Sequence, residues 1–128
     1  MRLAGIDYGS KRVGVALSDE SGRFALPFAV LPNDADLVPA LATLCRERSV
    51  GTVVVGESRT LAGQPNPIMS RALSFARQLR AATNLPIEFE PEFYTSAEAE
   101  RLQGKVKDLD ASAAALILKS YIDKQANS

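Results

Sequence analysis

A carboxylate, Asp7, lies near the middle of a run of strand-forming residues, GIDYGSKRVGVALSD, which extends from Gly5 to Asp19. Apolar residues on both sides predict two short buried strands around a polar turn at residues 9–12. An ionised Asp in such a place is costly unless it is paired or binds a metal ion. The turn offers Lys11 and Arg12 as ion-pair partners. A bound cation is the other explanation, and the residues alone leave both open.

The residues around Asp7 are small. Side chains alternate along a strand, so Asp7 shares its face with Gly5 and Gly9. The neighbouring predicted strand carries Gly, Ala and Ser at positions 14, 16 and 18, which leave a similarly open surface. A phosphate backbone or a hydrated cation therefore has room to approach the carboxylate.

Further acidic residues occur at the ends of predicted elements: Glu57, Glu88, Glu90, Glu92, Asp108 and Asp110. An Asp just before a helix is commonly its N-cap, and alternating Glu residues are typical of a solvated strand. Glu57 ends the central predicted strand, and active sites commonly gather at the ends of parallel strands. Asp7, either Glu57 or Glu92, and Asp110 would then converge on one sheet edge.

Carboxylate oxygens are the ligands that Mg²⁺ and Mn²⁺ prefer. Two such ions roughly 4 Å apart activate a water molecule and stabilise the leaving oxygen in phosphodiester hydrolysis. The chain has no histidine. That absence excludes a Ser-His-Asp triad, a Cys-His pair and a histidine general base, but it leaves carboxylate-bound metal chemistry available.

The remaining pattern predicts the elements that position these acids. A third strand is expected at residues 23–32, and Pro27 within it favours an edge or irregular position. Further strands are expected at 50–57 and 85–93, and helices at 34–48, 67–83, 95–104 and 110–125. Asp34 or Asp36 and Asn66 are the expected N-caps of the first two helices. This order predicts an α/β fold with a mixed five-stranded sheet, a three-strand meander followed by parallel strands, and helices on both faces.

Length and composition indicate one domain over residues 1–128. Fifteen basic residues balance fifteen acidic ones, so the net charge alone does not indicate a nucleic-acid-binding protein. No apolar run is long enough for a membrane span or a signal peptide, which favours a cytoplasmic protein. The single cysteine, Cys45, lies on the apolar stripe of a predicted helix and is expected to be a packing residue.

The segments GIDYGSKRVGVALSD, VVVG, TSAEAERL and DASAAALILKSYID resemble the successive motifs of the YqgF/RuvX family, which belongs to the ribonuclease-H-like superfamily and is related to the RuvC Holliday-junction resolvase. The resemblance covers nearly the whole chain. It implies a ribonuclease-H-like fold and a metal-dependent nuclease that matures the 5′ end of pre-16S rRNA, with branched DNA as a further substrate. Nucleic acid, a pre-ribosomal particle and Mg²⁺ or Mn²⁺ are the implied partners, for a monomer or a homodimer.

The resemblance also implies the site residues. The family's catalytic, metal-binding acids fall on Asp7, Glu92 and Asp110. In the family motif DERLTT, Asp and Arg flank the Glu, whereas Pro91 and Phe93 stand here. Related resolvases carry a Glu near the fourth strand, so Glu57 is a hypothetical additional metal ligand.

Phosphate contacts are expected from Lys11, Arg12 and Arg59, which lie in predicted turns or loops near the acids. Two rival functions remain. The first segment also looks like the phosphate-binding hairpin of the actin and sugar-kinase group, but those proteins close two domains around a nucleotide. The other rival is a noncatalytic nucleic-acid-binding module of ribosome assembly whose active site has decayed.

Overall fold

The computed structural model describes residues 1–58, 68–92 and 109–126. Along the chain these residues form β1 (Arg2–Tyr8), β2 (Arg12–Ser18), β3 (Ala25–Pro32), α1 (Leu37–Glu47), β4 (Val50–Ser58), α2 (Met69–Thr83), β5 (Ile87–Glu92) and α4 (Leu109–Ala126). The helices expected at 34–48 and 110–125 are confirmed. The helix expected at 67–83 begins at Met69, and its expected cap, Asn66, lies outside the described residues, as does the helix expected at 95–104.

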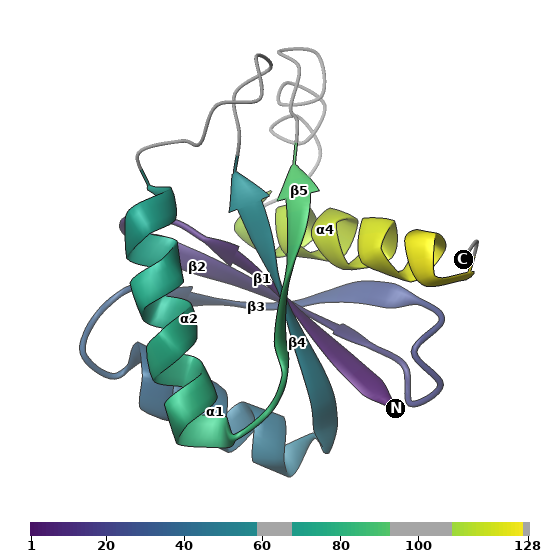
Figure 1. Cartoon of the computed structure of the whole chain (residues 1–128), viewed down its shortest axis with the longest axis horizontal. Helices are drawn as coiled ribbons and strands as arrows, with labels where there is room; N and C mark the ends of the chain where they lie inside the picture. The colour runs from purple at the N-terminus through teal and green to yellow at the C-terminus, as the bar shows by residue number, and fades with distance from the viewer. Residues whose placement is uncertain (59–67, 93–108, 127–128) are drawn as a thin grey trace.

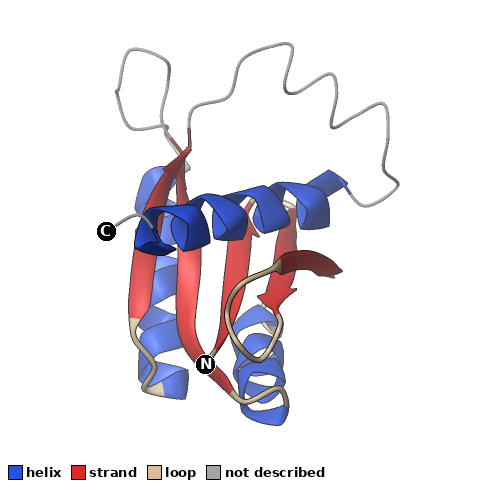
Figure 2. Ribbon diagram, turned by 90° about the vertical axis from the view of Figure 1, so that its right-hand side faces the viewer, coloured by secondary structure: helices blue, strands red, loops and turns tan. Residues whose placement is uncertain are grey.

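The strands form one sheet in the order β3-β2-β1-β4-β5. β1, β2 and β3 pair antiparallel, whereas β4 pairs parallel with both β1 and β5. Figures 1 and 2 show α1 and α2 on one face of the sheet and α4 lying across the other. The predicted meander, the parallel strands and the helices on both faces are therefore confirmed.

β3 is an edge strand with an irregularity beside Pro27. Its register with β2 shifts, because Val15 pairs with Ala29 while the next residue, Ala16, pairs with Pro27. Phe28 is thus an extra residue, and the guanidinium of Arg48 lies 4.9 Å from the centre of its ring. A proline donates no ladder hydrogen bond, which explains why it is tolerated only at such an edge.

Each face of the sheet buries its own apolar cluster. On the α1/α2 face the cluster includes Ile6, Val15, Leu41 and Leu79. Cys45 of α1 belongs to it, and burial raises the pKa of its thiol to about 11, so the packing role is confirmed. The cluster under α4 is smaller and consists of Leu3, Ala16, Val54, Ala114, Ile117 and Leu118.

α4 lies very close to the sheet at Gly5. A Cβ atom on Gly5 would lie 2.8 Å from the carbonyl oxygen of Ala114 and 2.9 Å from Cβ of Leu118. These atoms belong to the backbone and the first side-chain carbon of a packed helix, so they cannot move aside independently. Only glycine at this position allows α4 to lie directly on β1.

The second half of α4 is attached to β5 by polar contacts. Glu90 is buried, and its Oε2 accepts a hydrogen bond from Ser120 Oγ at 2.8 Å and lies 2.6 Å from Lys124 Nζ. Tyr121 donates a hydrogen bond to Glu88, and burial together with this bond raises the pKa of Tyr121 to about 12. Two of the three alternating glutamates thus hold the helix on the sheet, where a solvated strand was the alternative.

We predict that Gly5→Ala lowers the free energy of unfolding by about 1–3 kcal/mol, because the added methyl group pushes α4 off the sheet. The matched control is Gly51→Ala, where the methyl group would meet only the flexible side chain of the exposed Met1. Urea denaturation of both variants makes the comparison. Equal stability of the two variants would contradict the close approach.

We predict that Lys124→Met lowers the free energy of unfolding by about 1–3 kcal/mol, because it leaves the buried Glu90 carboxylate without its cation. Lys119 provides the control, since its ion pair with Asp123 on the same helix is exposed at both ends. Lys119→Met should therefore cost less than about 0.5 kcal/mol. Thermal and urea unfolding of Lys124→Met and Lys119→Met make the comparison. Losses of the same size in both variants would contradict the role of Lys124 in holding α4 on β5.

Candidate active site

Asp7 lies on β1 between glycines of the two neighbouring strands. It is half-buried near the end of β1 and pairs with Gly14 of β2. On the other side Ile6 pairs with Val55, which brings Gly56 of β4 beside Asp7. Glycine therefore flanks Asp7 on both adjacent strands, and both of these glycines are buried rather than open to solvent as the sequence had suggested.

Gly56 is a residue that sequence reasoning missed. A glycine that interrupts the apolar run VVVGES was a visible signal, since isolated strand glycines mark a close approach by a ligand or another backbone. Its position beside Asp7 was not readable, because it depends on the parallel register between β1 and β4. The residues directly beside Asp7 on both neighbouring strands therefore carry no side chain.

The position of Glu92 lies on the same face of the sheet as Asp7. Gly56 pairs with Glu90 and Ser58 pairs with Glu92, so the alternation carries the Asp7 face across β4 to β5. Glu92 is the last residue of β5, two strands away from β1, which corresponds to roughly 10 Å between the strand axes. Its side chain lies outside the described atoms.

Asp110 is the second residue of α4. It precedes Ala114 by one helical turn, and the Ala114 carbonyl lies over Gly5. Residues four apart share a side of a helix, so Asp110 occupies the side of α4 that packs on β1 and β2. The position of Asp110 thus lies on the α4 face of the sheet, which is also the face of Asp7.

Glu57 lies on the opposite face of the sheet from Asp7. It is level with Tyr8 in the parallel register, and both residues alternate onto the face covered by α1 and α2. The backbone therefore separates Glu57 from Asp7 by the thickness of the sheet, although both lie at strand ends. Of the two alternatives for the second acid, the register favours Glu92.

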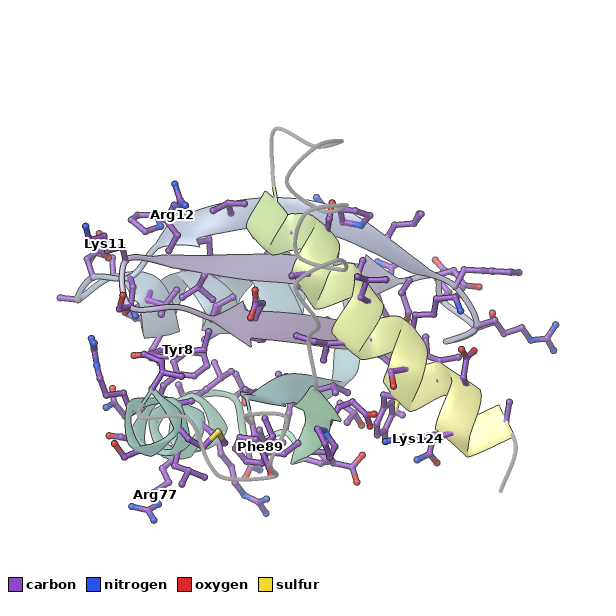
Figure 3. All side chains as sticks on the ribbon, turned by 90° about the horizontal axis from the view of Figure 1, so that it is seen from above. Tyr8, Lys11, Arg12, Arg77, Phe89 and Lys124 are labelled. Atoms are coloured by element: carbon purple, nitrogen blue, oxygen red, sulfur yellow. The ribbon has the colours of Figure 1, made fainter. Side chains whose placement is uncertain are left out.

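The basic residues are placed at the same end of β1. Lys11 and Arg12 lie in and beside the β1–β2 turn and are exposed (Figure 3). Arg59 lies outside the described residues. Among the side chains that the structure describes, no three potential ligands gather closely enough to hold a metal ion. The predicted ligand set instead combines the described Asp7 with two acids whose positions, rather than side chains, are known.

No helix within residues 1–58, 68–92 and 109–126 is both long enough and apolar enough to cross a membrane. The described part of the site combines the Asp7 carboxylate with a basic turn at the same end of β1. Oxygen ligands of this kind suit a hard divalent cation and an anionic substrate.

Comparison with known proteins agrees with this architecture. Residues 1–124 match the family model RuvX, described as Holliday junction resolvase. The chain is 39% identical over 137 residues to a Pelotomaculum thermopropionicum protein named "Putative pre-16S rRNA nuclease", a match that covers 98% of this chain and 88% of that protein. A Bordetella pertussis protein of the same name is 36% identical, with 94% and 92% covered.

Solved structures show the same fold at low sequence identity. Thermus thermophilus RuvC superposes with a TM-score of 0.61 at 13% identity and covers 99% of this chain and 97% of its own. The fowlpox virus Holliday junction resolvase gives a TM-score of 0.59 at 15% identity, with 97% and 99% covered. The expected ribonuclease-H-like fold is confirmed, and the family match over nearly the whole length shows that the chain belongs to the RuvX family.

Proposed function

We propose that this protein is a metal-dependent nuclease that hydrolyses phosphodiester bonds in nucleic acid. The observation that carries the proposal is the placement of Asp7 between Gly14 and Gly56, with the positions of Glu92 and Asp110 on the same face. A carboxylate flanked by glycines suits a cation-binding, phosphate-cleaving site, because the neighbouring positions add no side chain beside the bound ion.

In the proposed site Asp7, Glu92 and Asp110 hold Mg²⁺ or Mn²⁺. Carboxylate ligands fit these ions, and a pair of them would supply an activated water and stabilisation of the leaving oxygen. Asp7 places the site on β1, which is the central strand of the sheet. The glycines on both sides of it add no side chain between Asp7 and a substrate phosphate.

The proposed substrate is the precursor of 16S rRNA at its 5′ end, with branched DNA as a second substrate. The names of the relatives support the first and the family description supports the second. Lys11 and Arg12, with Arg59, would neutralise phosphates of the bound strand, so affinity should fall as salt concentration rises. The proposed setting is the cytoplasm, on a pre-ribosomal particle.

A noncatalytic nucleic-acid-binding module is the second candidate. The observation that favours it is Pro91, which occupies β5 directly before Glu92, where the family carries an Asp. This candidate requires salt-sensitive binding without metal-dependent cleavage. It gives no role to a carboxylate that is flanked by glycines near a strand end, which is why we prefer the nuclease.

Asp7→Asn should reduce Mn²⁺- or Mg²⁺-dependent cleavage by about a thousandfold, because several kcal/mol of metal-derived stabilisation are lost. Labelled structured RNA, single-stranded RNA and a four-way DNA junction are the substrates, each measured with metal and with EDTA. Asp123→Asn, on the exposed surface of α4, is the matched control and should cleave normally. Binding without cleavage by the wild-type protein would instead support the noncatalytic module.

Glu57→Gln should leave metal-dependent cleavage within about twofold of wild type, since the residue alternates onto the opposite face of the sheet. Glu92→Gln should lose most of the activity in the same assay. Initial rates over a range of Mn²⁺ concentrations separate a weakened metal site from a slower chemical step. If the Glu57 variant lost activity and the Glu92 variant kept it, the ligand set would have to be revised.

A further inference from the structure

A groove of about 400 Å³ opens on the α1/α2 side of the sheet, beside the end of β1. Its polar lining comes from Tyr8 of β1, Asn33 after β3, and Arg71, Ser74 and Gln78 of α2. Tyr8 directly follows Asp7 in the chain and points to the opposite face. The groove and the proposed acidic site therefore lie at the same end of β1 but on opposite faces of the sheet.

Tyr8 forms a fixed aromatic wall of this groove. Its ring centroid lies 4.8 Å from that of Phe75, with an angle of 33° between the ring planes. Phe75 is buried, so the pair is anchored in the core. A held aromatic side chain is a platform on which a base of any sequence can stack.

Asn33 in the groove is also oriented by two hydrogen bonds. Asn33 Nδ2 donates to the Gly9 carbonyl at 2.7 Å, and the backbone N–H of Asn33 donates to the Lys11 carbonyl at 2.9 Å. These bonds connect the groove wall to the β1–β2 turn. Side-chain amides carry both a donor and an acceptor, which matches the hydrogen-bonding edges of a nucleobase.

The charges around the groove favour a phosphate. Arg71 lines it and is exposed, and the turn that carries Lys11 and Arg12 is bonded to its wall. Asp34 is the acidic residue of the lining, and its Oδ1 accepts the backbone N–H of Asp36 at 2.9 Å. Figure 3 shows Tyr8, Lys11 and Arg12 on one side of α2, whereas Arg77 extends from the other side.

We infer that the groove binds one unpaired nucleotide of the nucleic-acid substrate, with its base against Tyr8 and its phosphate at Arg71. The inference rests on the proposed function, because it assigns the nucleotide to the strand that Asp7 would cleave. From the groove the strand crosses the end of β1 to reach Asp7. The bound nucleotide is therefore a close neighbour of the phosphate to be hydrolysed.

The test measures binding of a fluorescent single-stranded RNA octamer by anisotropy, in EDTA so that no cleavage occurs. Arg71→Ala should weaken binding about tenfold, whereas Arg77→Ala, on the same helix but outside the groove, should stay within about twofold. Both arginines are exposed, so both variants should fold, and circular dichroism checks this. Equal losses for the two variants would indicate general charge attraction and overturn the inference.

An abasic scan of the octamer separates base stacking from phosphate contact. Removal of the base at one position should weaken binding to wild-type protein about tenfold, and Tyr8→Leu should abolish that difference. A flat scan, or no binding by wild-type protein, overturns the inference. Binding in EDTA does not depend on metal or on Asp7. A flat scan together with Asp7-dependent cleavage therefore rejects only the groove, whereas a position-specific base effect without cleavage rejects only the nuclease.

Discussion

The contact between α4 and β1 at Gly5 is the constraint on which the site depends. The helix backbone at Ala114 lies so close to the strand that a single methyl group on Gly5 would not fit. This approach determines how near α4 lies to the sheet, and hence how near Asp110, one turn earlier, comes to β1. A bulkier residue at either point would move α4, and with it the position of Asp110, away from β1.

The two ends of α4 contact different parts of the sheet. Its first turns pack on β1 and β2 through small residues, while its last turns are held to β5 by Ser120, Tyr121 and Lys124. Across one row of the sheet, Gly14, Asp7, Gly56 and Glu90 lie side by side. Of the two acids in this row, Glu90 is neutralised by Lys124 and serves packing. Asp7 stands between two glycines, which suits a ligand of an external cation.

Local periodicity was sufficient to predict much of the fold. The alternation of side chains along a strand predicted that Asp7 lies on the same face as Gly5. Pro27 correctly indicated an irregular edge strand. Register between distant strands could not be read in this way. The partners Gly56 and Glu90 depend on two parallel pairings, and the burial of Glu90 depends on a helix 30 residues further along the chain.

The same limit explains why the candidate acids were only partly resolved from the sequence. Glu57 and Glu92 both end strands, and only the observed register separates them onto opposite faces. The groove at Tyr8 was likewise invisible, because it joins residues near positions 8, 33 and 71. Local patterns specify elements and faces, whereas sites are made where faces from distant segments meet.

The most direct test of the central claim is the position of the metal ion in a crystal grown with Mn²⁺, determined by anomalous diffraction. We expect a peak about 2.1 Å from a carboxylate oxygen of Asp7, with Glu92 and Asp110 as further ligands, and its loss in Asp7→Asn. A peak held by other residues, or a wild-type crystal with no Mn²⁺ at Asp7, would contradict the account.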